Sequence, residues 1–348
     1  MNVNVHAHGS LCGFPRGVYS RTIMSVRMKD IAHTLGISQT TVSHVLRGRG
    51  GEFRIGAETA RRVRDAVERL GYRPSVLARN LKHHRAYALA VAVGDLADPF
   101  WSALALGAQQ EAERHGYVLV VSHTGETLDK ERQLLEMLRE RRVDGLILAP
   151  AHLKPRHLAP LRDERRPFVL VDRTIDGLDV PSVITDSVAG VRLAVDHLVS
   201  RGHRQIGYLG GPAHITTFRD RLAGYRQALA AHGLRPGPYA VSRSDLDEAR
   251  KAAARLLRRR PAATAVIAGN LWLTMGTLRA APEDVVVVGF DDFYLADLLR
   301  RPVTTVAQPV EELGREAVRL LLEEIAAPGG NRHVVLPPRL IVRGGGRA

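Results

Sequence analysis

The feature that most constrains the fold is a regular alternation, from Ala86 onward, of short apolar runs with amphipathic stretches of helical period. Runs that are apolar throughout are typical of strands buried on both faces, and such strands occur in parallel sheets that helices cover on both sides. A chain of 348 residues leaves room here for two sheet-containing subdomains. The expected strands span residues 87–93, 118–122, 145–149, 168–171, 182–185, 205–209, 263–268 and 285–288, and the expected helices span 100–115, 128–141, 188–201, 221–232, 247–260 and 310–325.

In doubly wound sheets a ligand binds in the crevice beyond the carboxyl ends of the strands, so the residues that follow the expected strands are candidates for a binding site. Those positions hold aromatic, carboxylate and guanidinium groups, which together suit a small polar ligand. A single aspartate after a strand is often only the N-cap of the next helix, and it is the recurrence of such groups that favours a cleft. The candidates of this kind are Phe100, Trp101, Arg173, Asp186, Arg221, Asn270, Leu271 and Asp291.

A different pattern precedes this region. Residues 28–35 place their apolar side chains on one helical face, and Gly36 follows where a left-handed residue is needed to end a helix. Ser38 then supplies an N-cap oxygen for a second short amphipathic helix, residues 39–46. Helix, glycine turn and capped helix form the helix-turn-helix arrangement, whose second helix enters the major groove of DNA. The early turns of this second helix leave Gln39, Thr40, Thr41 and His44 outward.

A third helix and the distribution of charge strengthen this interpretation, because two small amphipathic helices alone would be weak support. The third helix is expected from Ala57 to Leu70, with an arginine-rich outer surface. Residues 1–85 contain 15 Lys/Arg and 5 Asp/Glu, so they carry a net charge of +10 of the chain's +14. The N-terminal quarter is therefore the part that is expected to face a polyanion.

The segment from Ser75 to Lys82 is too short to form a stable helix alone. It is capped by Ser75 and exposes Leu77 and Leu81. It is either a linker with incidental leucines or a segment that folds only when held, with an apolar side chain available to wedge into the minor groove.

Several runs resemble motifs of the lactose/galactose repressor family, and the resemblance covers about residues 28–343. The resemblance implies a regulator with an N-terminal all-α helix-turn-helix domain and a hinge helix, followed by a C-terminal α/β effector domain of two parallel-sheet subdomains, like a periplasmic binding protein. The runs are Lys29-Asp30-Ile31-Ala32, Gly36-Ile37-Ser38, Thr41-Val42-Ser43-His44-Val45-Leu46, Leu70-Gly71-Tyr72-Arg73-Pro74 and Ala78-Arg79-Asn80-Leu81.

The domains that we expect are the helix-turn-helix domain at 28–74, the hinge at 75–85 and the effector-binding and dimerisation domain at 86–348. Residues 1–27 have no helical or strand period and are expected to be a disordered tail or the product of an upstream start codon. The resemblance implies that His44 contacts bases and that Leu81 inserts at the centre of the operator. The DNA-binding candidates are Ser38, Gln39, Thr40, Thr41, Ser43, His44, Arg54, Tyr72, Arg79, Leu81 and Lys82.

The resemblance also implies roles in the cleft: Trp101 would stack on the effector, Arg221 would hydrogen-bond it, and Arg173, Asp186 and Asp291 would line or support the pocket. Three departures from the family pattern stand out. Asn270-Leu271 replaces the usual Asn-Asp, and leucine cannot accept a hydrogen bond from the effector. Three explanations stay open: the ligand presents an apolar group there, Asn270 acts as the acceptor instead, or the usual sugars no longer bind. Residues 49–53 resemble an insertion that adds an arginine near the phosphates, and the helix before residue 283 is shortened.

Other classes of protein are disfavoured by what the sequence lacks. It has no P-loop, no Gly-x-Ser-x-Gly, no His-Glu-x-x-His and no glycine fingerprint after a strand, so we expect no enzymatic activity. The single cysteine, Cys12, excludes an internal disulfide and a cysteine-based metal cluster. No apolar run approaches the roughly 18 residues that span a bilayer, and no signal peptide is recognisable. We expect a cytoplasmic protein that needs no cofactor and no metal.

The sequence therefore predicts a DNA-binding regulator, most simply a repressor, that binds a palindromic operator as a homodimer and responds to a small effector such as a sugar. Two alternatives stay open. One is a periplasmic-type solute-binding protein without a role on DNA, which shares the two-lobed architecture. The other is a regulator whose effector is not a sugar.

Overall fold

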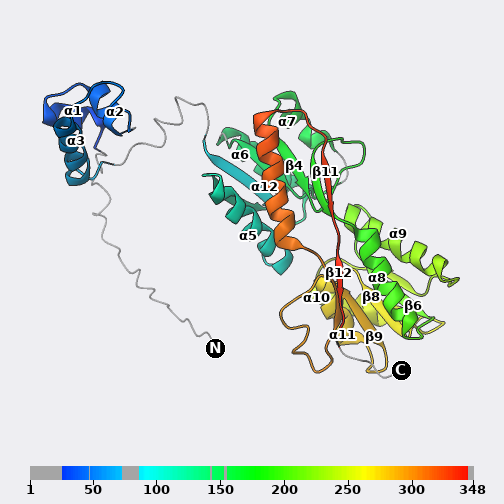
Figure 1. Cartoon of the computed structure of the whole chain (residues 1–348). Helices are drawn as coiled ribbons and strands as arrows, with labels where there is room; N and C mark the ends of the chain where they lie inside the picture. The colour runs from blue at the N-terminus through cyan, green and yellow to red at the C-terminus, as the bar shows by residue number, and fades with distance from the viewer. Residues whose placement is uncertain (1–25, 47, 73–85, 142, 153–154, 344–348) are drawn as a thin grey trace, which may run out of the picture. The chain divides into compact units, whose positions relative to one another are not determined.

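The structure, a computed structural model, describes residues 26–46, 48–72, 86–141, 143–152 and 155–343. The chain divides into two compact units, one ending at His84 and one beginning at Arg85 (Figure 1). The predicted hinge at 75–85, and with it Arg79, Leu81 and Lys82, lies outside the described residues, as does the predicted tail up to residue 25.

The described part of the N-terminal unit consists of three short helices, α1 (Met28–Leu35), α2 (Gln39–Leu46) and α3 (Ala57–Arg69). The three helices share one hydrophobic core, and its fully buried residues include Ile31, Val42 and Val63. The three helices predicted from periodicity are confirmed, and Gly36 ends α1 in the left-handed conformation with φ of 65°.

The start of this unit differs from the prediction. Val26 and Arg27, which we had assigned to the tail, belong to the unit. Val26 packs against its core, and the backbone N–H of Arg27 donates to the carboxylate of Asp30 at 2.7 Å. An acidic side chain in the first turn can satisfy the backbone in this way, so α1 does not need a serine or threonine cap.

The C-terminal unit contains two sheets of six described strands each, and the predicted class of fold is confirmed. All neighbouring strands are parallel except β10 and β12. One sheet has the order β11-β5-β4-β3-β1-β2 and the other β12-β10-β9-β8-β6-β7. The strands are β1 (Ala88–Val93), β2 (Val118–His123), β3 (Gly145–Leu148), β4 (Phe168–Val171), β5 (Ser182–Thr185), β6 (Ile206–Gly210), β7 (Tyr239–Val241), β8 (Ala265–Ala268), β9 (Val286–Phe290), β10 (Thr304–Ala307), β11 (His333–Leu336) and β12 (Arg339–Ile341).

Helices cover the faces of these sheets, as strands buried on both faces require. They are α5 (Pro99–Arg114), α6 (Leu128–Glu140), α7 (Ala159–Asp163), α8 (Ser187–Ser200), α9 (Thr216–Ala231), α10 (Leu246–Leu257), α11 (Leu271–Ala280) and α12 (Val310–Ala326), with a short 3₁₀ turn at Pro155–Leu158. Periodicity did not mark α7 and α11, which are short, although the resemblance implied a shortened helix before residue 283, and α11 lies there. Periodicity also missed β7, β10, β11 and β12, which carry polar residues or lie near an edge.

Three segments connect the two lobes of this unit. The chain passes between the lobes from β5 into α8, from β10 into α12 and from β11 into β12. The last crossing is the segment drawn in red in Figure 1, in which β11 lies in the first lobe and β12 in the second. Any rotation of one lobe relative to the other would have to be absorbed at these three short crossings.

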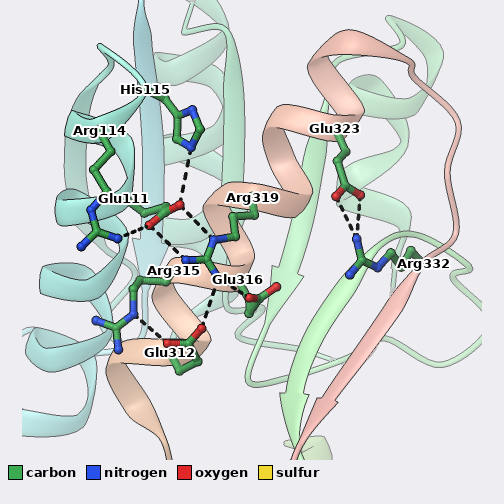
Figure 2. Close-up of polar contacts among 9 residues, drawn as sticks. All are labelled: Glu111, Arg114, His115, Glu312, Arg315, Glu316, Arg319, Glu323 and Arg332. Carbon is green, nitrogen blue, oxygen red and sulfur yellow. Dashed lines mark hydrogen bonds and ion pairs between the residues drawn. The ribbon is translucent and has the colours of Figure 1, made fainter.

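Helices α5 and α12 pack at close range in the first lobe (Figure 2). Glycines at the contact allow this approach, since a Cβ on Gly107 would overlap the carbonyl of Glu311 and one on Gly314 would overlap the carbonyl of Leu104. Above the contact, the carboxylate of Glu111, which is nearly fully buried, accepts from Arg319 of α12 at 2.9 Å. Helix α12 thereby returns from the second lobe into a fixed position in the first.

We expect Gly314→Ala to destabilise the protein by about 1–3 kcal/mol, although alanine favours a helix by roughly 1 kcal/mol over glycine. The added methyl group meets backbone on the neighbouring helix, so the two helices must separate. Urea denaturation followed by circular dichroism measures the change. Gln110→Ala on the exposed face of α5 is the control, and a Gly314→Ala protein as stable as that control would show that the helices can move apart at little cost.

Candidate functional site

Helix α2 presents a polar face, as predicted. The hydroxyl of Ser38 accepts from the backbone N–H of Thr41 at 3.0 Å and so caps the helix. Gln39 and Thr40 are exposed, whereas Thr41 and Ser43 are half-buried. On α3 the arginines predicted to face outward are exposed; they are Arg61, Arg62, Arg64 and Arg69.

Two of the DNA-binding candidates lie in unexpected surroundings. Tyr72 is not a surface residue: it packs in the core of the three helices with 8% of its surface exposed, and burial raises the pKa of its hydroxyl. His44, predicted to point outward, is half-buried because the ring of Phe53 stacks on it, with 3.5 Å between ring centroids and 24° between planes. Arg54 is exposed and has a φ of 52°.

In the C-terminal unit, residues that follow several strands converge on a cavity of about 80 Å³ between the two lobes. Six of the eight effector candidates line it, namely Phe100, Trp101, Arg173, Arg221, Asn270 and Asp291. They follow different strands of both sheets, which is where the rule that places ligand sites beyond the carboxyl ends of parallel strands expects them.

Asp186 and Leu271 are not among the residues that line this cavity. Asp186 is the N-cap of α8, where its carboxylate accepts from the backbone N–H of Ala189 at 2.8 Å, which is the simpler role that any aspartate after a strand can have. Leu271 is buried at the first position of α11 and lines an adjacent, more open cavity of about 600 Å³. The next side chain, Trp272, lines the cleft instead.

Nine further residues that were not among the eight candidates also line the cleft: Asp95, Asp98, Glu126, Asp172, Thr217, Phe218, Ser244, Trp272 and Gln308. Asp95, Asp98 and Asp172 directly follow strands that were predicted, so the same rule could have included them. Gln308 follows β10, which was not predicted. Glu126 follows the edge strand β2 and gave no signal apart from its place after a strand.

Arg173 is held by a bidentate ion pair with Glu126, with Nη1–Oε2 at 2.6 Å and Nη2–Oε1 at 2.9 Å. Its guanidinium also lies over the ring of Trp101 at 5.0 Å, and Nη1 donates to the carbonyl of Pro150 at 3.3 Å. The nearby carboxylates raise the pKa of Arg173 against the opposing effect of burial. The side chain is therefore fixed in place before any ligand arrives.

Arg221 is buried at the opposite wall, with 3% of its surface exposed. Its Nη1 donates to the carbonyl of Gly269 at 2.7 Å, and its guanidinium lies 3.7 Å from the centroid of Phe290. Its Nε is buried and has no hydrogen-bond partner within the described residues, and the same holds for Oε1 of Gln308. The cleft thus contains a donor and an acceptor that a bound ligand could satisfy.

Three buried carboxyl groups face these arginines. Burial raises the pKa of Asp98 to about 6, assisted by the negative charge of Asp291 and opposed by the N–H of Phe100 and the indole of Trp272. Burial likewise raises the pKa of Asp172 to about 6 and raises that of Asp291, in both cases opposed by Arg221 among others. Burial therefore outweighs the arginines beside Asp172 and Asp291, and it outweighs the two hydrogen bonds that favour the charged form of Asp98.

The backbone of two of these aspartates is also unusual. Asp172 has a φ of 63° and Asp291 a φ of 70°, a conformation that costs most residues other than glycine free energy. Such backbone strain is concentrated at functional sites, where the surrounding structure holds it in place. At the ends of β4 and β9, it turns both side chains into the cleft.

Contacts beside the cleft join the two lobes directly. Asp176 of the first lobe pairs with Arg219 of α9 at 2.6 Å, and the backbone N–H of Thr174 donates to the hydroxyl of Thr216 at 3.1 Å. The imidazoles of His152 and His214 stack with centroids 5.8 Å apart. These contacts would have to break if the lobes moved apart.

A metal site and a membrane-spanning helix can each be recognised from the side chains and helices in the part of the chain that the structure describes. There, no group of three or more His, Cys, Asp or Glu side chains is arranged to hold a metal ion. Within the same residues, no helix has the length and apolar character needed to cross a membrane.

Comparison with protein families gives two matches. Residues 27–75 match the model described as bacterial regulatory proteins, lacI family. Residues 86–342 match the model described as periplasmic binding proteins and sugar binding domain of the LacI family. The two matches together cover both of the compact units.

Individual proteins are similar over nearly the whole chain. The ribose operon repressor of Halalkalibacterium halodurans is 31% identical, with 91% of this chain and 96% of the relative covered. The repressor CytR of Escherichia coli is 31% identical, with 92% and 96% covered. Among solved structures, the lac repressor dimer bound to operator and the anti-inducer ONPF has a TM-score of 0.83 at 26% identity, with 93% of this chain and 100% of the other covered.

Proposed function

The chain belongs to the LacI family of bacterial regulatory proteins, and we propose that it is a cytoplasmic repressor that binds a two-fold symmetric operator as a homodimer and is switched by an uncharged, sugar-like effector. The observation that carries the proposal is the presence in one chain of a capped, polar-faced α2 and a two-lobed cleft with unsatisfied polar groups. A solute-binding protein would need the cleft but not the helix-turn-helix.

Exposed apolar side chains support a dimer. On β2 at the edge of the first sheet, Val118, Val120 and Val121 are 67%, 38% and 37% exposed. In the second lobe, Tyr294 is 91% and Leu298 75% exposed. Exposed apolar side chains on both lobes suit contacts between subunits, and a dimer would bring two copies of α2 to two half-sites.

The charges of the cleft favour an uncharged effector. Five carboxylates line it, those of Asp95, Asp98, Glu126, Asp172 and Asp291, against the two guanidiniums of Arg173 and Arg221. Both guanidiniums already have partners in the protein, so a phosphate or carboxylate on the ligand would meet an excess of negative charge. A sugar hydroxyl can both accept a hydrogen bond from Arg221 Nε and donate one to Gln308 Oε1.

The departure at Leu271 does not weigh against a sugar, because that side chain lies outside the cleft lining. Asn270 does not replace the missing acceptor in this structure. Its Oδ1 accepts from the backbone N–H of Leu273 at 2.9 Å, and its Nδ2 donates to Ser244 at 2.8 Å. We infer that Gln308 and the buried aspartates supply the acceptors instead.

The switch that we propose is a rotation of the two lobes about their three crossings. A cavity of about 80 Å³ is small for a ligand site, whose usual volume is roughly 300–1,000 Å³, so the lobes must open to admit the effector. An effector that stabilises one orientation changes the spacing of the two hinge segments in the dimer. Coupling of this kind is typically about 1–3 kcal/mol.

Selection of binding sites from random DNA tests the proposal. We expect the selected sites to be two-fold symmetric, with half-sites about one helical turn apart, and binding to weaken steeply as salt rises because phosphate contacts release counterions. A single asymmetric half-site would contradict the dimer. A chain that selects no DNA sequence but binds a sugar would favour the solute-binding alternative.

His44→Ala is expected to relax the base preference at one position of each half-site by about 0.5–1.5 kcal/mol, the value of a single hydrogen bond. A base contact carries sequence information that a phosphate contact does not. Titrations against operators changed at single base pairs measure this. Arg61→Ala on the exposed face of α3 is the control and should change affinity equally for all operators. Unchanged preference in His44→Ala would make His44 a phosphate contact.

A further inference from the structure

The loop between α2 and α3, residues 48–56, contains the stretch that departs from the family pattern. Gly48, with φ of 71°, and Arg49 end α2 by donating to the carbonyls of Val45 and His44, each at 3.0 Å. The loop then closes on itself, since the N–H of Ile55 donates to the carbonyl of Gly50 at 2.9 Å and Ile55 packs against the helical core. The extra residues therefore form an ordered structure attached to the end of α2.

This loop places the aromatic ring of Phe53 against His44 on the polar face of α2. Phe53 remains 48% exposed although its ring stacks on that of His44 at 3.5 Å. An apolar side chain held half in solvent next to a polar helix face is not explained by the core, which it does not join. Its one aromatic contact in the described residues is with His44.

Arg49 supports the same ring. Its side chain pairs with Glu52, with Nε–Oε2 at 2.8 Å and Nη2–Oε2 at 2.6 Å, and its guanidinium lies 5.5 Å from the centroid of Phe53. The sequence had indicated that this arginine would face phosphates. In the structure its charge is balanced by Glu52, and the pair forms part of the packing around Phe53.

We propose that Phe53 is a positioning residue for His44, so that the loop 48–56 helps to determine which base pair α2 reads. The inference rests on the proposed function, since it assumes that α2 reads DNA. It adds a residue outside the helix-turn-helix to the determinants of specificity.

The stacking limits what His44 can offer to a base. Nδ1 of His44 is buried and has no hydrogen-bond partner within the described residues, so Nε2 is the ring nitrogen that can reach a base edge. One nitrogen forms one hydrogen bond, whereas an arginine at such a position can form two. Discrimination by a single hydrogen bond depends on its direction, and Phe53 fixes that direction by holding the plane of the imidazole.

Titrations of the full-length protein against its selected operator, and against operators changed at each base pair of the half-site, test this role. Phe53→Ala should lower discrimination about three- to tenfold at the base pair that His44→Ala affects. The double variant should lose no more than His44→Ala alone, because the two residues act through one contact. Phe53→Tyr keeps the ring and should retain the wild-type preference.

A matched control is Glu58→Ala on the exposed surface of α3, because Glu58 pairs with Arg61 and takes no part in the packing around Phe53. This variant should alter affinity equally across the operators. Phe53→Leu keeps apolar bulk without a ring face and should behave like Phe53→Ala, so the test stands even if the alanine variant does not fold. Uniform weakening by Phe53→Ala and Phe53→Leu on all operators would overturn the proposal in favour of a purely structural loop. A changed preference at a base pair that His44→Ala leaves untouched would overturn it as well.

These titrations distinguish a failure of the positioning role of Phe53 from a failure of the proposed repressor function. If the wild-type protein selects a two-fold site but His44→Ala keeps its base preference, the positioning role of Phe53 is overturned and the repressor function stands. If the wild-type protein selects no sequence, the proposed function itself has failed.

Discussion

Arg221→Lys is expected to weaken effector binding about 100-fold while leaving operator affinity unchanged. Lysine keeps the positive charge that faces Asp172 and Asp291, so the buried carboxyl groups stay compensated. It loses the planar fork that holds the carbonyl of Gly269 and directs Nε, and an ammonium cannot reproduce this geometry. Loss of hydrogen bonds to a charged group costs about 1.5–3 kcal/mol, which is a factor of roughly 10 to 100 or more.

Thermal unfolding in the presence of pentoses, hexoses and their phosphates identifies the effector and measures this effect. A ligand present at 100 times its Kd stabilises the wild-type protein by about 2.7 kcal/mol, so the sugar that binds should raise its Tm clearly and the phosphates should not. Arg226→Met is the matched control, because Arg226 lies on the same helix, is exposed and does not line the cavity. An Arg221→Lys protein that keeps the wild-type shift would place the effector elsewhere.

Asp98→Asn is expected to stabilise the unliganded protein by up to about 3 kcal/mol at pH 8 and to have almost no effect at pH 4. The pKa of Asp98 is raised from 3.8 to about 6, so its protonated form is favoured in the folded state. The stability that this proton contributes is fully present below pH 3.8 and is lost as the pH rises through 6. Asparagine is uncharged at every pH, so the Asp98→Asn protein does not lose this stability as the pH rises.

Urea denaturation at a series of pH values measures the difference. The wild-type curve should fall between pH 4 and 7 more steeply than that of the Asp98→Asn protein, and Asp172→Asn should act in the same direction because burial also raises its pKa to about 6. Asp95→Asn in the same loop is the control for a less buried position. Equal pH slopes for the wild-type and Asp98→Asn proteins would mean that water reaches the Asp98 carboxylate in solution.

Local patterns in the sequence were enough to predict most of the helices and strands. The helices around Gly36 and Ser38 were predicted within a residue, because a left-handed glycine and a capping hydroxyl act over a single turn. Strands such as β4 and β5 were predicted with the correct ends, because they are buried on both faces and therefore apolar throughout. The edge strand β2 has the same apolar pattern but is largely exposed, and the pattern alone cannot distinguish an exposed edge strand from a buried one.

The roles of individual side chains in the cleft could be assigned only from the folded structure. The sequence placed Trp101, Arg173 and Arg221 correctly, because their positions after strands bring them to one crevice. It could not separate Asp186, which caps a helix, from Asp172, which faces the cavity, since both directly follow a strand. The difference lies in the backbone: Asp172 has a φ of 63° and turns inward, and no local pattern marked this.

By itself, the sequence determined that this protein joins a basic helix-turn-helix to a two-lobed α/β cleft, because helix caps and buried strands are specified by neighbouring residues. The tertiary structure decided which groups meet across long separations in the chain. It paired Glu126 with Arg173, brought Gln308 beside Asp291, and laid Phe53 of the inserted loop on His44. These contacts depend on how whole elements pack, and packing is a property of the complete fold.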